Sequence, residues 1–151
     1  MEFFKPSEKR PGCAWVAFRA KRSIVPGTHM AAGRSLPHDL AQYVIEAATG
    51  YTHGFWGLLA RGATYKTTGR KVTKPGRAII VAHRAELVAS EVLAGEHLYY
   101  WAAGRVTPVT EALDAALEQW RALTLDERLV YEWPAPSGRI VPAVEGETLT
   151  L

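Results

Sequence analysis

Apolar side chains recur at intervals of three and four residues along much of the chain, which is the spacing of one face of an α-helix. The first such run begins at Pro37, a residue favoured at helix starts, and stops at Gly50. Its apolar positions are Leu36, Leu40, Tyr43, Val44 and Ala47. A second, shorter helix is predicted over residues 53–61, where glycines within and beside the segment permit close packing or an irregular turn.

Two more helices are predicted in the second half of the chain. Residues 77–103 form the longest helical run, and Gly95 is the position where we expect a bend, since an unbroken helix of this length would span roughly 40 Å. Thr107 and Pro108 then provide an N-cap and a first-turn proline for the next helix. Its apolar stripe is Val109, Leu113, Ala116, Leu117, Trp120 and Leu123.

Strand-forming residues gather at the N-terminal end. Residues 13–20 are rich in β-branched and aromatic side chains and lie between two Pro-Gly turn signals, so they predict a strand. Residues 2–5 are interpreted as a short partner strand. Residues 24–30 are interpreted as a loop.

A second strand region is predicted near the C-terminal end. Residues 127–133 alternate, with Leu129, Tyr131 and Trp133 on one side. Residues 134–138 are expected to turn and residues 139–141 to return as a second strand. Residues 143–151 are predicted to be a loose tail.

Strand regions at both ends that enclose helices predict an α+β fold, in which about four helices pack on a small antiparallel sheet of N- and C-terminal strands. The alternative is a mostly helical bundle with peripheral hairpins. No internal repeat or composition break divides the sequence, so residues 1–151 are expected to form a single globular domain.

Composition agrees with a folded domain, because 48% of the 151 residues are apolar and 22% are charged. No apolar run approaches the roughly 18 residues that a membrane helix needs, and the N-terminal residues are charged where a signal peptide is apolar. A cytoplasmic protein without membrane contact is therefore expected. The single cysteine, Cys13, excludes an internal disulfide framework and a cysteine-based zinc cage.

The net charge of +3 hides an uneven distribution of charged residues along the chain. Residues 1–77 hold 13 Lys and Arg against 4 Asp and Glu, whereas residues 78–151 hold 5 against 11. One interpretation is that the two halves fold onto each other, so that their charges largely cancel. The basic half can also pair with the acidic half of a second copy, which would form a homodimer. The other is that the basic half binds phosphate-bearing partners.

The strongest basic segment covers residues 66–77, and residues 64–76 are expected to form a polar loop. Its cations are Lys66, Arg70, Lys71, Lys74 and Arg77. Such a loop can contact phosphates, and Tyr65 and Trp56 are expected to supply a stacking surface beside it. A solvated loop without a ligand is the competing interpretation.

The long helical run also carries polar residues on its apolar arc. Arg84 and Glu91 fall near the middle of that arc, about 10.5 Å apart along the axis, so each would need a partner from elsewhere if buried. A possible buried polar site is therefore assigned to this pair, with a half-exposed helix edge as the alternative. His83 and Glu86, three residues apart, can offer two metal ligands from one face.

Histidines and carboxylates elsewhere provide further weak candidates. His38 and Asp39 lie at a predicted helix start, where first-turn structural roles compete with acid–base or metal chemistry shared with His53. Signatures for phosphate loops, dinucleotide binding, zinc proteases and serine hydrolases are absent from the sequence. The weak catalytic candidates are His38, Asp39, His53, His83 and Glu86.

The string Leu36-Pro37-His38-Asp39-Leu40, followed by Gly54-Phe55-Trp56-Gly57 and Gly62-Ala63, resembles a stretch found in small uncharacterised proteins of high-GC bacteria. The resemblance covers residues 36–63. It implies a bacterial origin and a shared structural unit, and it transfers no activity or site residue.

The leading functional interpretation is a small cytosolic binding or regulatory protein rather than an enzyme. It engages a protein, a nucleic acid or another phosphate-bearing ligand through its basic N-terminal half, and the sequence identifies no cofactor for it. One alternative is a metal-assisted hydrolase that uses the histidines and carboxylates named above. Another is a homo-oligomeric assembly protein.

Overall fold

Strands from both ends of the chain form one antiparallel sheet in the computed structural model, which describes residues 1–5, 14–19, 23–26, 36–68 and 71–143. Within these residues the sheet has five strands in the order β3-β2-β1-β4-β5. The strands are β1 (Glu2–Phe4), β2 (Ala14–Arg19), β3 (Ser23–Pro26), β4 (Glu127–Tyr131) and β5 (Gly138–Pro142). The predicted α+β fold, with a sheet of terminal strands, is confirmed.

The N-terminal strand lies in the middle of the sheet and joins its two halves. Phe3 of β1 is opposite Trp15 of β2 on one side and opposite Leu129 of β4 on the other. The prediction of a loop over residues 24–30 is wrong for residues 24–26, because these residues belong to β3 and pair with β2. Pro26 ends this edge strand, a position that tolerates the missing backbone N–H of proline. Residues 27–30 and the predicted tail from residue 144 lie outside the described residues.

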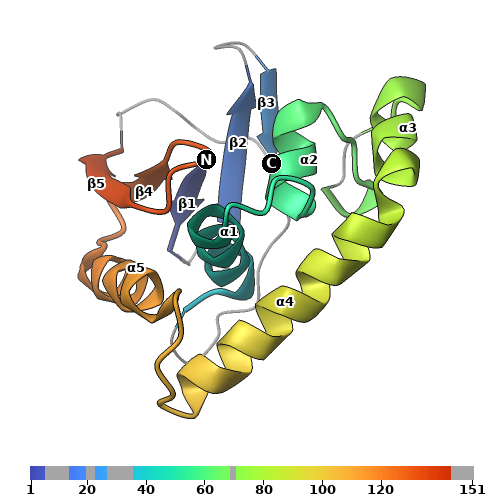
Figure 1. Ribbon diagram of the computed structural model, residues 1–151. Coiled ribbons are helices and arrows are strands. Elements are labelled where there is room, and N and C mark those ends of the chain that lie inside the picture. The colour runs from blue at the N-terminus through green and yellow to red at the C-terminus, as the bar shows by residue number, and fades with distance from the viewer. Residues whose placement is uncertain (6–13, 20–22, 27–35, 69–70, 144–151) are drawn as a thin grey trace.

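The described residues contain five α-helices and one short 3-10 helix (Figure 1). The α-helices are α1 (His38–Thr49), α2 (Phe55–Arg61), α3 (Lys74–Ala82), α4 (Arg84–Ala102) and α5 (Thr110–Ala122), and the 3-10 helix is η1 (Lys66–Thr68). The helix predicted over residues 77–103 is therefore two helices. They separate at His83, whereas Gly95 lies within α4.

Helix α1 forms where its apolar spacing predicts, and it ends as expected at Gly50. Gly50 has a φ of 69°, in the left-handed region, and its N–H donates to the Ala47 carbonyl at 3.3 Å. The next helix, α2, also ends at a left-handed glycine, Gly62. These two glycines end the helices of the short α1–α2 unit, which lies beside the sheet.

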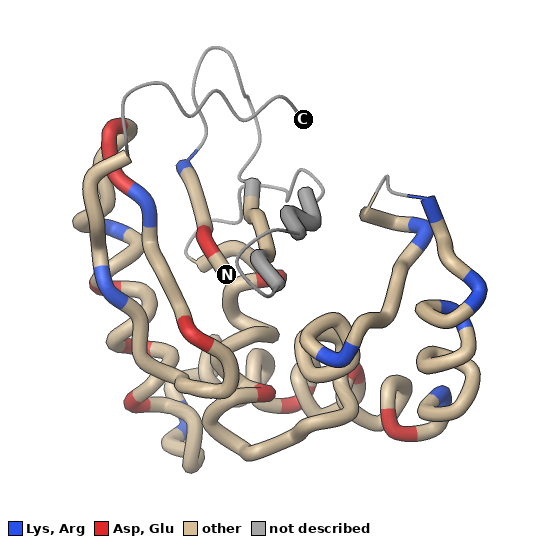
Figure 2. The backbone as a smooth tube through the Cα atoms, turned by 90° about the horizontal axis from the view of Figure 1, so that it is seen from above, with Lys and Arg blue, Asp and Glu red and all other residues tan. Residues whose placement is uncertain are grey.

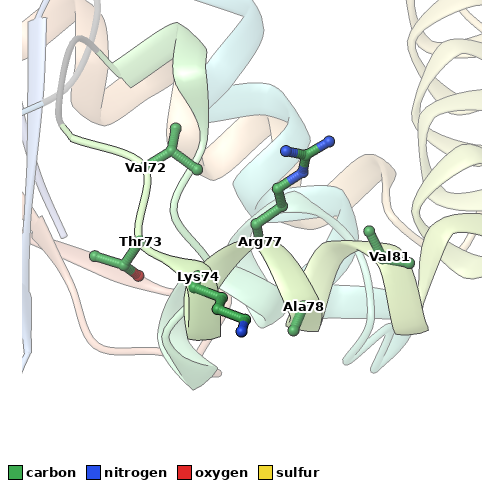
Figure 3. A pocket seen from close by; sticks show the side chains of 6 residues that line it. All are labelled: Val72, Thr73, Lys74, Arg77, Ala78 and Val81. Atoms are coloured by element: carbon green, nitrogen blue, oxygen red, sulfur yellow. The ribbon is translucent and has the colours of Figure 1, made fainter.

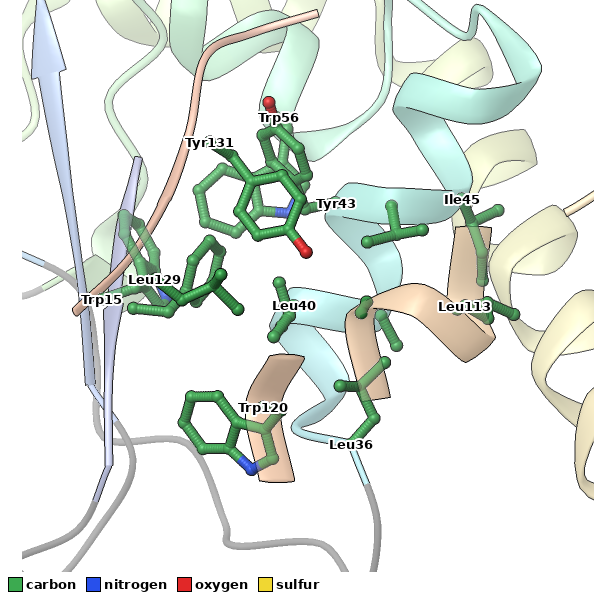
Figure 4. Packing of buried hydrophobic residues seen from close by; sticks show 14 of the residues in the cluster. Trp15, Leu36, Leu40, Tyr43, Ile45, Trp56, Leu113, Trp120, Leu129 and Tyr131 are labelled. Carbon is green, nitrogen blue, oxygen red and sulfur yellow. The ribbon is translucent and has the colours of Figure 1, made fainter. Parts of the chain in front are cut away.

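The core lies between the sheet and α1, α2 and α5, and it is strongly aromatic (Figure 4). Trp15, Tyr43 and Trp56 are each 0% exposed. The ring centroids of Trp15 and Trp56 are 4.6 Å apart, and those of Tyr43 and Trp56 are 5.5 Å apart, both edge-on. Such pairs contribute about 0.5–1.5 kcal/mol each beyond the burial of their area, so this cluster anchors α1 and α2 to the strands.

Helix α4 runs along the outside of the helical layer (Figure 1). Ser90 and Ala94 are buried on its inner side, where α4 packs against α1. On its outer side Val88, Val92 and Tyr99 are 57%, 58% and 70% exposed. Among the described residues, no helix is both long enough and apolar enough to cross a membrane.

Candidate functional site

The predicted polar loop over residues 64–76 is wrong in part, because η1 covers residues 66–68 and α3 begins at Lys74. Two threonines hold the N-terminus of α3. The Thr73 side chain accepts a hydrogen bond from the Gly76 N–H at 3.1 Å, so Thr73 is the N-cap. Thr64 in turn accepts from the Thr73 N–H at 3.0 Å. A Cβ on Gly76 would lie 2.3 Å from the Thr64 hydroxyl oxygen, and the absent side chain therefore allows the first turn of α3 to approach residue 64.

A shallow pocket opens beside this helix start and is called here the α3 pocket (Figure 3). It has a volume of about 530 Å³ and is lined by Val72, Thr73, Lys74, Arg77, Ala78 and Val81. The side chains of Lys74 and Arg77 leave the first turn of α3 in different directions. Both cations are exposed, and so are Lys66 and Lys71. Arg70 lies outside the described residues.

The aromatic residues expected beside these cations take other places. Trp56 is 0% exposed in the core, and its indole N–H donates to the Asp39 carbonyl at 3.1 Å. Its ring is covered on the surface side, so the predicted role of Trp56 in ligand stacking is wrong. Tyr65 is half-buried, its ring stacks on Phe55 at 4.5 Å, and its hydroxyl donates to the Phe55 carbonyl at 3.2 Å.

A second, more enclosed space lies between the start of α1 and the middle of α4, and is called here the polar cavity. Its volume is about 280 Å³, and its lining is His38, Asp39, Gln42, Phe55, Thr67, Thr68 and Glu91. Asp39 accepts a hydrogen bond from the indole N–H of Trp15 at 2.9 Å. The hydrogen bond between the His38 and Asp39 side chains raises the pKa of His38. The Trp15 contact joins α1 to β2.

Glu46 is a buried carboxyl group to which the sequence assigned no role of its own. It is 1% exposed and accepts hydrogen bonds from the backbone N–H groups of Trp56 and Gly57 at 3.0 and 3.4 Å. It thus caps the start of α2, whose N-cap residue, Gly54, has no side chain to do so. Burial raises the pKa of Glu46 to about 7.

Gln42 links the buried carboxyl group to the polar cavity. Its amide nitrogen donates to Glu46 at 3.2 Å and to Glu91 of α4 at 2.9 Å. Glu91 is nevertheless exposed, and Arg84 is exposed as well. The predicted buried polar site of Arg84 and Glu91 is therefore wrong. The buried face of α4 is the one that carries Ser90 and Ala94.

A third cluster, called here the histidine cluster, brings together His53, His83 and Glu86. His53 comes from the turn between α1 and α2, His83 from the α3–α4 junction, and Glu86 from the first turn of α4. The two imidazole rings are stacked, with centroids 4.3 Å apart and planes 13° from parallel. His83 Nδ1 lies 3.5 Å from a Glu86 carboxylate oxygen.

The candidate residues thus divide among three places in the described part of the chain: the α3 pocket, the polar cavity and the histidine cluster. The catalytic candidates do not form one site, because His38 and Asp39 line the polar cavity whereas the other three make up the histidine cluster. Spacing could identify His83 and Glu86 as neighbours, but only the fold could add His53. No family model matches this chain, and the searches of curated proteins and solved structures likewise found no similar protein.

Proposed function

We propose that this protein is a non-catalytic binding protein that holds a phosphate-bearing polyanion, such as a nucleic acid strand, on the surface formed by η1, residues 71–73 and α3. The observation that carries the proposal is a long segment of the chain whose charged side chains are all positive. Between Glu46 and Glu86 the sequence contains no Asp or Glu, and it contains seven Lys and Arg. Exposed cations of such a segment attract phosphates and concentrate polyanions near them.

The placement of the cations supports an extended ligand rather than a single anion. Lys66, Lys71, Lys74 and Arg77 are exposed on consecutive elements, and Figure 2 shows Lys and Arg along this side of the molecule. Because Lys74 and Arg77 project in different directions, they do not converge on one phosphate. Separate cations along a surface match the repeated charges of a nucleic acid backbone.

The positions of Trp56 and Tyr65 define what kind of recognition is expected. Trp56 is in the core and Tyr65 is packed on Phe55, so neither ring is presented flat to a base. Phosphate contacts position a strand but carry no sequence information. We therefore propose binding that depends on charge and depends little on base sequence.

The experiment that tests this proposal is the binding of a fluorescently labelled single-stranded oligonucleotide, followed by anisotropy at low salt. The variant Lys71→Glu/Lys74→Glu/Arg77→Glu is expected to bind at least tenfold more weakly than the wild type. The matched control is Arg105→Glu/Arg121→Glu/Arg139→Glu, which makes the same change in net charge at exposed positions elsewhere. Equal weakening by both variants, or no binding by the wild type, would reject the proposed surface.

A second candidate function, self-association, is favoured by the exposed apolar side of α4. The residues Ala85, Val88, Val92 and Tyr99 follow the three-, four- and seven-residue spacing of a helix-pairing seam, and all four are exposed. We call them the α4 stripe. Exposed apolar side chains aligned in this way are typical of a surface that another helix covers.

We infer from the charges beside the α4 stripe that its partner is a second copy of this chain. Arg84 and Glu91 are seven residues apart on the same edge of the stripe. If two α4 helices pack antiparallel about a twofold axis between Ala85 and Val88, Arg84 of each copy faces Glu91 of the other. The same contact then occurs twice. Sedimentation equilibrium tests this candidate, since it predicts a dimer for the wild type and a monomer for Val88→Glu.

A further inference from the structure

The histidine cluster has the composition of a transition-metal site. It offers two imidazole nitrogens and one carboxylate oxygen, each from a partly buried side chain. Imidazole ligands favour zinc and similar borderline cations, whereas magnesium and calcium prefer sites made entirely of oxygen. We propose that His53, His83 and Glu86 bind a zinc-type divalent cation, with a fourth position left for water.

The distances among the donor atoms are close to those that such a cation requires. The three donor atoms lie within 4.8 Å of one another, so a point exists that is no more than about 2.8 Å from each of them. Zinc is bound at about 2.0–2.2 Å by histidine nitrogen and carboxylate oxygen. Side-chain movements of less than about 1 Å therefore complete the coordination, and the backbone can stay in place.

The free donor at the centre of the cluster strengthens the assignment. The Nδ1 atom of His83 is buried and makes no hydrogen bond among the described residues, although a Glu86 oxygen lies 3.5 Å away. A buried polar atom without a partner is costly. A cation bound between His83 and Glu86 would satisfy this nitrogen.

The stacking places the two imidazoles next to each other, with ring centroids 4.3 Å apart and planes 13° from parallel. The lone pair of an imidazole nitrogen lies in the plane of its ring, so rotation of the two side chains is needed to point both nitrogens at one cation. A cation bound there would hold both rings beside the Glu86 carboxylate.

The backbone holds all three ligands from separate parts of the fold. The Tyr51 hydroxyl donates to the Glu86 carbonyl at 2.7 Å and ties the α1–α2 turn to the first turn of α4. The same turn packs on α2, where a Cβ on Gly57 would lie 2.1 Å from the Thr52 carbonyl oxygen. His83 is fixed at the helix junction, because its carbonyl accepts from the Leu87 N–H at 2.9 Å. A bound cation would thus cross-link the α1–α2 turn to the α3–α4 junction.

The test is calorimetric titration of the purified, chelator-treated protein with Zn²⁺ alone. One equivalent is expected to bind to the wild type. His53→Ala and Glu86→Gln are each expected to weaken binding by more than about 100-fold, since losing even a hydrogen-bonding partner behind a metal ligand costs roughly 10–100-fold. The matched control is His38→Ala, which removes an exposed histidine that also lies beside a carboxylate and is expected to bind like the wild type.

A second readout separates loss of a ligand from loss of folding. Glu86→Gln replaces a half-exposed carboxylate by a side chain of the same shape, so its circular dichroism spectrum should match that of the wild type. Zn²⁺ should raise the melting temperature of the wild type and leave that of folded Glu86→Gln unchanged. Absence of stoichiometric binding, or equal binding by wild type, His53→Ala and Glu86→Gln, would overturn the proposal and leave the histidines as a packing contact only.

Discussion

At the scale of single residues, Glu46 shows how a charge-bearing side chain can be a structural element. It lies in the core because it replaces the N-cap side chain that Gly54 lacks, and it satisfies two of the backbone N–H groups at the start of α2. The position of Glu46 on the predicted helix was known from the sequence, but its partners are ten and eleven residues away in another helix. Local pattern therefore could not assign this role.

The raised pKa of Glu46 predicts a pH-dependent stability. Burial moves this pKa from 4.5 to about 7, so the folded state binds the proton more tightly than the unfolded state. The free energy of unfolding should therefore fall as the pH rises from about 4.5 to 7, by up to about 3 kcal/mol, and level off above that range. Gln42 faces Glu46 and donates hydrogen bonds to it and to Glu91. Tyr65 lies close enough for the Glu46 carboxyl group to act on its hydroxyl.

Urea unfolding at pH 5 and pH 8 measures this contribution when the wild type is compared with Glu46→Gln. The variant cannot titrate at this position, so the difference between the two proteins should shrink or reverse in favour of Glu46→Gln as the pH rises. The other titratable groups are common to both proteins and cancel. Parallel pH profiles for wild type and variant would contradict the raised pKa.

Gly54 predicts a second effect at the residue scale. A Cβ at this position would lie 2.4 Å from the Glu46 carboxyl carbon, which is buried and hydrogen-bonded and has little room to move. Gly54→Ala should therefore destabilise the protein by about 1–3 kcal/mol in urea unfolding. Gly95→Ala is the control, because nothing lies within 4 Å of its Cβ position in α4, and it should stabilise by about 0.5–1 kcal/mol. Equal effects at both positions would be inconsistent with this packing.

At the scale of elements, periodicity predicted most helices but placed the break in the long run wrongly. Gly95 is a weak helix former, yet it is tolerated on the exposed side of α4. The break instead occurs at His83, whose ring stacks on His53 from a distant turn. Local hydrophobic periodicity does not depend on a contact between distant residues, so only the tertiary structure could locate the helix break.

The sequence pattern also could not decide which face of α4 is buried. The sequence placed Arg84 and Glu91 within an apolar arc and left open whether the arc was buried. In the structure the buried residues of α4 are Ser90 and Ala94, and Leu98 and Trp101 are partly buried against the core, whereas Val88 and Val92 are exposed. Small residues allow the helices to approach closely, so α1 and α4 pack without large apolar side chains at positions 90 and 94.

A charge swap tests the proposed antiparallel pairing of α4 with its own copy. Arg84→Glu should weaken the dimer, because it places two carboxylates opposite each other twice in the interface. The double variant Arg84→Glu/Glu91→Arg should restore association, since the pairs are re-formed with their signs exchanged. Sedimentation equilibrium measures both. A monomeric wild type, or a double variant no better than Arg84→Glu, would contradict the pairing.

At the scale of the whole molecule, the architecture was predictable because both chain ends carry strand patterns and the middle carries helical ones. The structure adds that β1 is the central strand, so the first residues of the chain hold the two halves of the sheet together. The candidate site was less predictable. Charge spacing identified the cations of α3, whereas the burial of Trp56 depends on contacts with Trp15 and Tyr43 that no local rule specifies.

The central claim is that exposed cations around α3 bind a phosphate backbone, and the salt dependence of oligonucleotide binding tests it most directly. Lys66, Lys71, Lys74 and Arg77 are four exposed cations, so the logarithm of the binding constant should fall with the logarithm of salt concentration with a slope of about −3. In Lys71→Glu/Lys74→Glu/Arg77→Glu the slope should approach −1. A slope near zero in the wild type, or the same slope in this variant, would contradict the account.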